Sequence, residues 1–277
     1  MAEEKEMKIP ALKNIDPEYL RAIEKLRFID DDFMVKIFED IPCTEFLLQN
    51  IMNREDLIVK SVQAQYDIKN LNGRSVRLDI FAVDKGNKLY NIEIQRSNSG
   101  AVLKRARYNA SLIDAHITNP GDDYKDLCDT YVIFITENDV FKKGLPVYHI
   151  EKVIQETGDF VDDGSHIMYV NSTVQDDTAL GWIMHDFFCT DPNDMHYDIF
   201  ARRAKYFKET EEGVRQVCQI MQDFKNKGVK EGRIEQAKDM AIELADMGMS
   251  VEQIAKAAKC DTKTVKGWLD KKESMNC

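Results

Sequence analysis

The sequence SVRLDIFAVDKGNKLYNIEIQR, residues 75–96, predicts two adjacent β-strands that form the centre of the fold. The strands are expected over residues 76–83 and 88–95, because both are rich in β-branched, aromatic and aliphatic residues. Between them, Asp84-Lys85-Gly86-Asn87 is a turn sequence with a glycine available for positive φ. Both strands are apolar on both faces, which is typical of an α/β sheet covered by helices on each side.

Three polar residues, Asp79, Glu93 and Gln95, interrupt these apolar strands. With a three-residue loop, Asp79 stands opposite Glu93, and Gln95 shares the face of Glu93 because side chains alternate along a strand. Two facing carboxylates repel each other unless a cation lies between them, and their oxygens suit Mg²⁺ or Mn²⁺. The alternative is that Asp79 lies at a sheet edge and Glu93 pairs with a lysine or arginine. A one-residue slip in register would also separate the three side chains.

The order and spacing of these residues resemble a known nuclease motif. Asp79 followed by Glu93-Ile94-Gln95 resembles the PD-(D/E)XK signature, in particular that of the recombination-promoting nuclease/transposase group, which reads D…ExQ. The helix that follows in that group carries an R-x-x-Y pattern, matched here by Arg105 and Tyr108. The upstream sequence DDFMVKIFED, residues 31–40, resembles the opening element of the family. The likeness covers roughly the first half of the chain. The C-terminal third resembles the family only in its general character.

The resemblance implies a restriction-endonuclease-like core and a metal-dependent DNA endonuclease. Asp79 and Glu93 would hold Mg²⁺ or Mn²⁺ with the backbone carbonyl of Ile94, and the metal would activate water. Gln95 stands where the wider superfamily has lysine. Glutamine is neither a cation nor an acid, so it could only orient the attacking water, which leaves the rate and the number of metal ions open. Arg105 or a second metal would supply positive charge.

The segment 97–117 is expected to be a helix, with the Ser-Asn-Ser sequence at 97–99 as its cap. One stripe at helical spacing includes Arg105, which we therefore expect to point at the sheet; the stripe is Arg105, Tyr108, Leu112 and Ala115. A cation there can neutralise the carboxylates or bind the scissile phosphate. The alternative is a structural ion pair. Arg107 lies off the stripe and is expected to face solvent or phosphate.

The remaining elements complete an α/β fold class with a mixed central sheet flanked by helices. Further strands are expected at residues 57–68, 131–136 and 166–170, and helices at 10–53 and 178–224. In the resembled superfamily the opening region sometimes lends an acidic group to the metal. Asp32 and Glu39 are the candidates here, although helix capping and solvent exposure are the simpler interpretations.

The C-terminal part is expected to be a helical extension. The charged, glycine-containing stretch 225–232 predicts a link, which divides the chain into a nuclease-like domain, 1–224, and a helical segment, 225–277. Residues 249–269 resemble a helix-turn-helix that would present Lys263 and Lys266 to a DNA groove. Lys259 stands where such turns usually have glycine, a conformation that a lysine can adopt at some cost. A helical hairpin that packs on the protein or on a second copy is the equal alternative.

A second group of metal-binding residue types lies at His185, Cys189 and His196, with Asp186 and Asp194 nearby. Their spacing matches no common zinc template, and helix-surface and loop positions explain them more simply.

Composition narrows the classes of function further. The chain of 277 residues has a net charge of −11, which counts against broad nonspecific binding of nucleic acid. Local basic patches remain open: one beside the carboxylates, formed by Arg96, Lys104, Arg105 and Arg107, and lysines near the C-terminus. The chain contains no long apolar run, no signal-peptide pattern and no paired cysteine motif, so we expect a cytoplasmic protein without a membrane partner.

Three functions are consistent with the sequence. The first is a DNA endonuclease whose cutting promotes recombination; its partner is DNA, and a homo-oligomer is open. The second is a non-catalytic DNA-binding or regulatory protein on a nuclease-like fold. The third is a protein-interaction scaffold. No residue pattern predicts a DDE transposase core.

Overall fold

The computed structural model describes residues 15–70, 73–97 and 99–275, and the chain divides into two units, Met1–Cys218 and Gln219–Cys277. Among the described helices, none combines the length and the apolar composition that crossing a membrane requires.

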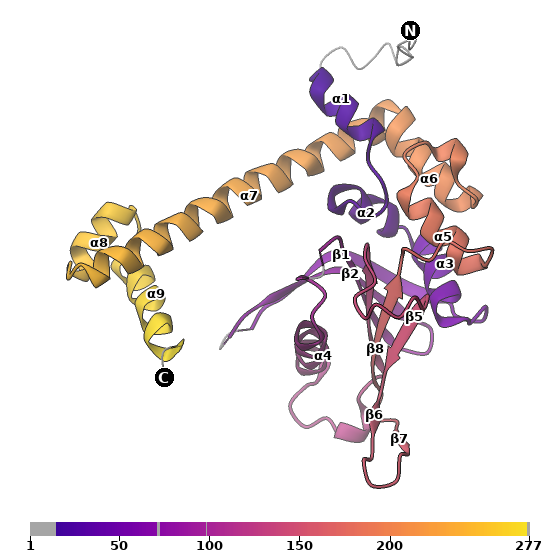
Figure 1. Ribbon diagram of the computed structural model, residues 1–277, viewed down its shortest axis with the longest axis horizontal. Helices are drawn as coiled ribbons and strands as arrows, with labels where there is room; N and C mark the ends of the chain where they lie inside the picture. The colour runs from indigo at the N-terminus through magenta and orange to yellow at the C-terminus, as the bar shows by residue number, and fades with distance from the viewer. Residues whose placement is uncertain (1–14, 71–72, 98, 276–277) are drawn as a thin grey trace. The chain divides into compact units, whose positions relative to one another are not determined.

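The first unit is built on a mixed six-stranded sheet with the order β1-β2-β3-β4-β8-β5 (Figure 1). Strand β2 is antiparallel to both β1 and β3. Strands β3, β4 and β8 are parallel to one another, and β5 is antiparallel to β8. Their bounds are β1 Val59–Ile68, β2 Val76–Asp84, β3 Leu89–Gln95, β4 Thr130–Thr136, β5 Val147–Ile150 and β8 Ser165–Asn171. This confirms the predicted mixed sheet flanked by helices. The sequence did not reveal β5 or the exposed pair β6 (Lys152–Val153) and β7 (Phe160–Val161), because these strands are short.

Helix α4 (Leu103–Ile117) lies across the sheet face that carries Glu93. Ala106 and Ala110 of α4 pack in one cluster with Phe134 of β4 and Tyr169 of β8. Figure 1 shows α4 on one side of the sheet and α2 (Asp31–Phe38) on the other. These contacts fix the position of α4 over β4 and β8, and from there Arg105 and Asn109 reach Glu93 of β3.

The predicted cap at 97–99 is wrong. The helix begins at Leu103 after Val102, which makes no capping hydrogen bond through its side chain. The hydroxyls of Ser97 and Ser99 lie 2.8 Å apart and bond each other in the connection instead, and Asn98 lies outside the described residues. The chain must first leave the end of β3, and the Tyr169 hydroxyl holds this connection by donating to the carbonyl of Ala101 at 2.8 Å.

The buried stripe of α4 is displaced by about one residue from the predicted stripe. The buried residues are Ala106, Asn109, Ala110 and Ile113, whereas Ala115 is exposed. Arg105 lies at the margin of the buried stripe and still reaches the sheet, while Arg107 is exposed, as expected.

A cluster of phenylalanine rings joins the N-terminal helices to the helices that follow the sheet. Helices α2 and α3 (Ile41–Met52) contact β1, and their rings meet those of α5 (Ala179–Phe188) and α6 (Asp198–Glu209). The rings in mutual contact are Phe28, Phe33, Phe38, Phe46, Phe187, Phe200 and Phe207. Before them, α1 (Pro17–Glu24) is capped by Asp16, whose side chain accepts the N–H of Glu18. The connection between α4 and β4 contains a short 3₁₀ helix, η1 (Tyr124–Asp126).

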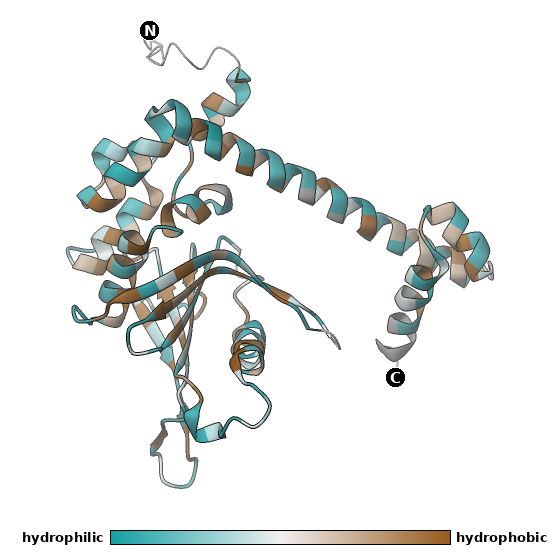
Figure 2. Ribbon diagram, turned by 180° about the vertical axis from the view of Figure 1, so that it is seen from behind, coloured by the Kyte–Doolittle hydropathy of each residue, from teal (hydrophilic) through white to brown (hydrophobic). Residues whose placement is uncertain are grey.

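The second unit consists of most of α7 (Glu211–Asp246) with α8 (Val251–Ala258) and α9 (Thr262–Met275). Residues 225–232, expected to be a link, are helical and lie within α7. In Figure 2, α7 is mostly hydrophilic, with hydrophobic residues at intervals, whereas the strands of the central sheet carry long hydrophobic stretches. Because the charges of 225–232 are spaced along one helix, composition alone could not separate a solvated helix from a link.

The C-terminal helical hairpin has the expected local geometry. Ser250 caps α8 with a capping box, and Asp261 accepts the backbone N–H of Thr264 at 2.8 Å at the start of α9. Lys259 adopts the left-handed conformation, with φ 52°, that the turn requires. The core of the unit is Ala241, Ile254, Ala255 and Val265. Lys263 and Lys266 are exposed on α9.

Candidate metal centre

The register of the central hairpin brings Asp79 opposite Glu93. The β2–β3 ladder pairs Val83 with Leu89 and ends with Ile80 paired with Ile92, so the next position along the ladder faces Asp79 with Glu93. Beyond that point the N–H of Ile94 does not bond to the backbone of β2. It donates instead to the carboxylate of Asp79, at 3.2 Å. The predicted register is therefore confirmed, and the two strands part where the carboxylates meet.

The backbone carbonyl of Ile94 faces the same gap. The N–H and C=O of one strand residue point to the same edge, so the carbonyl of Ile94 is on the side of its N–H, toward β2. The described β2 ladder stops before this residue. The next carbonyl, that of Gln95, faces β4 and accepts the N–H of Glu137 at 3.0 Å. Ile94 can thus offer an oxygen beside Asp79, as the resemblance implies.

Glu93 is fully buried, with a side-chain exposure of 0%, and it is held from above by α4. Arg105 forms an ion pair with one of its oxygens, and the Asn109 amide donates to the other at 3.4 Å. Arg105 also donates to the carbonyl of Gly100 at 3.1 Å, so its guanidinium is fixed over the sheet. Burial raises the pKa of Glu93 to about 8; the charge of Asp79 adds to the rise, and Arg105 opposes it.

Two buried carboxamides beside Glu93 are incompletely bonded. Asn91, two residues earlier on the same face of β3, is fully buried, and both polar atoms of its side chain lack a hydrogen-bond partner among the described residues. In the same part of the chain, Asn109 Oδ1 lacks a partner as well. Each such atom costs about 1–3 kcal/mol if nothing binds it. Carboxylates, a backbone carbonyl and amide oxygens together are the donor set of a hard divalent cation, so the residues present fit Mg²⁺ or Mn²⁺.

Gln95 lies half-buried at the rim of this cluster, against Gly100. A Cβ atom at position 100 would lie 1.9 Å from Gln95 Oε1, so only glycine leaves room for this placement of the glutamine. The glycine that ends the Ser-Asn-Ser-Gly sequence, in the connection between β3 and α4, thus leaves room for the side chain of Gln95.

Arg96, which the sequence placed in a basic patch, is neutralised by two acidic residues. It forms ion pairs with Asp30 at 3.1 Å and with Glu137 at 3.3 Å, and Arg27 contacts the same two carboxylates. The neighbouring Lys104 and Arg107 are exposed. Arg96 is exposed as well, but its charge is engaged by these acidic residues.

Among the described acidic side chains of α2, Asp31 is electrostatically linked to the arginines of the site. Desolvation and the charge of Asp30 raise its pKa, and the charges of Arg96 and Arg105 lower it. Glu39 faces elsewhere, in ion pairs with Lys36 at 3.1 Å and Arg203 at 3.4 Å, and the side chain of Asp32 is not among those described. The run of three aspartates at 30–32 was the available sequence signal for Asp31.

A mixed sheet with paired carboxylates on adjacent strands, under a helix that supplies an arginine, defines a nuclease-like α/β domain. Residues 43–173 match the family model described as PD-(D/E)XK nuclease family transposase, so this part of the chain is similar to that family. Asp79, Glu93, Ile94, Gln95 and Arg105 all lie within the matched residues. The comparison with curated proteins gave no match, and neither did the comparison with solved structures.

Proposed function

We propose that this protein is a Mg²⁺-dependent DNA endonuclease that hydrolyses phosphodiester bonds, with recombination as the process implied by the resemblance. The observation that carries the proposal is the fully buried Glu93, which faces Asp79 and lies beside amide atoms that find no hydrogen-bond partner in the described part of the chain. A purely structural core would be more stable without these groups. The loss of stability caused by burying these polar groups is explained if a cation and a phosphate complete the cluster.

Each residue has a distinct role in this proposal. Asp79, Glu93 and the carbonyl of Ile94 hold the cation, which supplies an activated water and neutralises charge on the phosphate. Glu93 must be ionised for this role, so its raised pKa couples metal binding to the release of a proton.

Arg105 and Gln95 then act on the substrate. Arg105, which is held over the sheet beside Glu93, would contact the phosphate, and the carboxamide of Gln95 would orient the attacking water. Because Gln95 replaces the lysine of the wider superfamily, the positive charge near the phosphate comes from α4.

We further propose that the nuclease-like domain covers 1–224, and that the segment 225–277, with its hairpin at 249–269, steers DNA binding or dimerisation. The exposed Lys263 and Lys266 of α9 support DNA as the partner.

A second candidate is a non-catalytic DNA-binding or regulatory protein on the same fold. The observation in its favour is the ion pair between Glu93 and Arg105, which satisfies the buried carboxylate without a metal. This reading predicts DNA binding that survives loss of the carboxylates, and no strand cleavage in any variant.

The test is cleavage of supercoiled plasmid with Mg²⁺ or Mn²⁺ by the wild type and by the Asp79→Ala and Glu93→Gln variants. We expect metal-dependent nicking that falls by at least about a hundredfold in both variants, because each removes a charge that holds the cation. Asp67→Asn is the matched control, since Asp67 lies on β1 in an exposed ion pair with Arg77 and should cleave normally. A folded wild type that binds DNA but never nicks it would favour the second candidate.

A further inference from the structure

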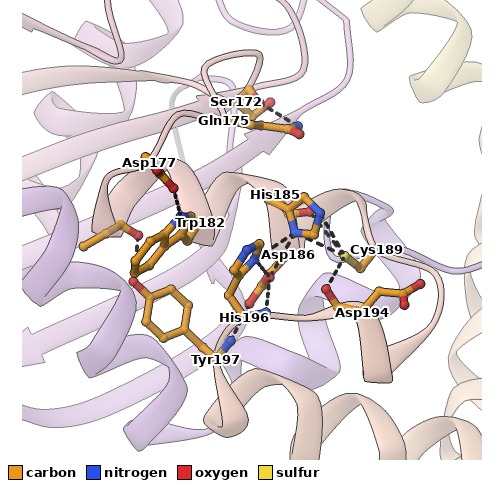
Figure 3. A network of polar contacts seen from close by, with 11 residues as sticks. Ser172, Gln175, Asp177, Trp182, His185, Asp186, Cys189, Asp194, His196 and Tyr197 are labelled. Atoms are coloured by element: carbon orange, nitrogen blue, oxygen red, sulfur yellow. Dashed lines mark hydrogen bonds and ion pairs between the residues drawn. The ribbon is translucent and has the colours of Figure 1, made fainter.

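A second cluster of metal-binding side chains lies outside the residues that match the nuclease family (Figure 3). His185 and Asp186 are on α5, and His196 follows the short 3₁₀ helix η2 (Pro192–Asp194), just before α6. The Nδ1 atoms of His185 and His196 lie 3.1 Å apart. Asp186 Oδ1 lies 3.3 Å from each of these nitrogens. Three potential ligand atoms therefore form a nearly equilateral triangle.

The backbone around Asp186 holds this triangle in place. Asp186 is fully buried, and its two oxygens accept the backbone N–H groups of His196 at 2.8 Å and Tyr197 at 3.0 Å. The carboxylate thereby fixes the chain segment that carries His196 against the end of α5. These bonds leave one acceptor position of Oδ1 for a further partner on the side of the two imidazoles.

The ring of His196 is oriented by a neighbouring aromatic side chain. Trp182 stacks on it with ring centroids 5.6 Å apart and planes only 3° from parallel. The indole of Trp182 is itself anchored, because its Nε1–H donates to Asp177 at 3.2 Å. Figure 3 shows the two imidazoles and the carboxylate pointing toward one another. The backbone bond to Asp186 and the stacking of Trp182 therefore both hold His196 in place.

The three atoms of this triangle are close enough to be bonded by one cation. A single proton on one Nδ1 can bond only one of the other two atoms with good geometry. Two protonated nitrogens at 3.1 Å would place their N–H groups against each other. A cation at the centre satisfies all three lone pairs together. Ligand atoms at tetrahedral angles around Zn²⁺, bound at about 2.0–2.1 Å, are separated by about 3.3 Å, which is the spacing observed here.

We propose that His185, Asp186 and His196 bind one Zn²⁺ ion in a tetrahedral site whose fourth ligand is water. Two imidazoles and a carboxylate are ligands that zinc accepts. The sulfur of Cys189 is the nearest further candidate ligand, at 3.5 Å from His185 Nδ1, but it lies almost as near to Nε2 of the same ring, at 4.0 Å. It therefore sits against the imidazole rather than in line with the nitrogen lone pair.

The ion would connect the end of α5 to the chain segment that leads into α6. That segment is also anchored at Thr190, whose carbonyl accepts from the buried Lys208 of α6 at 2.6 Å. The same lysine donates to the carbonyl of Glu24 at 3.2 Å, so the segment is tied to the N-terminal helices. Zinc binding would thus stabilise the helical layer, and it is separate from the oxygen-ligand site of Asp79 and Glu93.

The test is titration of the full chain, freed of metal by a chelator, with Zn²⁺ in competition with a chromophoric chelator. We expect one tight site in the wild type, and binding weakened by at least about tenfold in His185→Ala and in His196→Ala. The two imidazoles are 39% and 40% exposed, so their removal should leave the fold intact, which circular dichroism verifies. His149→Ala is the matched control, because His149 is exposed on β5 and should bind zinc normally.

Two further measurements separate this site from its alternatives. Tight binding must persist in Asp79→Ala, which removes a ligand of the proposed nuclease site. With Co²⁺ in place of Zn²⁺, the absence of a thiolate charge-transfer band supports water as the fourth ligand, and a band lost in Cys189→Ser would replace water with Cys189. Equal zinc affinity in the wild type and the double variant His185→Ala/His196→Ala would overturn the proposal.

Discussion

Glu93 and Asp186 are both carboxylates with an exposure of 0%, yet their surroundings differ. Asp186 accepts two backbone N–H groups at 2.8 and 3.0 Å, so its charge is bonded by the fold itself. Glu93 has a side-chain cation, a weak amide contact and a facing carboxylate, and its pKa rises to about 8. Burial alone therefore does not indicate a functional site.

The hydrogen bonds around a buried carboxylate therefore distinguish a structural role from a functional one. A carboxylate held by backbone donors shapes the chain locally, and its removal should damage the fold. A carboxylate that faces another carboxylate, with partnerless amides beside it, lowers stability and is retained for another reason. Exchanging each residue for a neutral one should therefore have opposite effects on the free energy of unfolding.

The largest expected difference is between Asp186→Ala and Glu93→Gln. Asp186→Ala leaves the N–H groups of His196 and Tyr197 unbonded, so we expect a loss of about 3 kcal/mol in the free energy of unfolding. Glu93→Gln removes a buried charge, so its stability should equal or exceed that of the wild type near pH 8. Urea unfolding with a chelator present measures both.

Asp186→Asn is the control for this comparison, because asparagine keeps an acceptor oxygen in the same shape. It should lose less stability than Asp186→Ala. If Glu93→Gln were the more damaging substitution, Glu93 would be the structural carboxylate and the contrast drawn above would be wrong.

The pH dependence of stability should expose the raised pKa of Glu93. The folded chain binds this proton with a pKa of about 8 and the unfolded chain with an ordinary value of 4.5, so the wild type loses stability as the pH rises between these values. Glu93→Gln lacks this loss. We expect the stability of the variant relative to the wild type to grow by on the order of 3 kcal/mol from pH 5 to pH 8.5.

Denaturant unfolding in metal-free buffers at both pH values provides the measurement. A difference between variant and wild type that does not change with pH would mean that the Arg105 ion pair keeps Glu93 ionised throughout, and the functional interpretation of its burial would lose its support.

A smaller effect is expected from Gly100→Ala. The new Cβ would displace the side chain of Gln95, from which it would lie 1.9 Å, so we expect about a tenfold loss of cleavage rate with little change in stability. Gly228→Ala is the matched control, because Gly228 lies in α7 with no atom within 4 Å of an added Cβ. Unchanged cleavage by Gly100→Ala would remove Gln95 from the proposed site.

The sequence predicted the carboxylate site because hairpin register depends on local rules. Strand alternation and one turn placed Asp79 opposite Glu93, and helical spacing placed Arg105 over the sheet. Asn91 obeys the same alternation as Glu93, and Asn109 follows Arg105 by one helical turn, so both could have been predicted. They were missed because neutral amides give no charge signal.

The sequence could not predict features that depend on the path of a loop. His196 reaches His185 only because the segment after α5 turns back and bonds to Asp186. No short-range pattern encodes that return. Likewise, the connection before α4, which begins at Leu103, is held by Tyr169, a residue distant in sequence that bonds the carbonyl of Ala101.

The central claim is that Asp79 and Glu93 bind a divalent cation, and direct measurement of Mn²⁺ binding tests it without assuming a DNA substrate. Calorimetry or electron paramagnetic resonance should show a Mn²⁺ site in the wild type that is lost in both Asp79→Ala and Glu93→Gln. The site should remain in the His185→Ala/His196→Ala double variant, which removes the separate zinc cluster. Mn²⁺ binding that is the same in the wild type and in the two carboxylate variants would contradict the account.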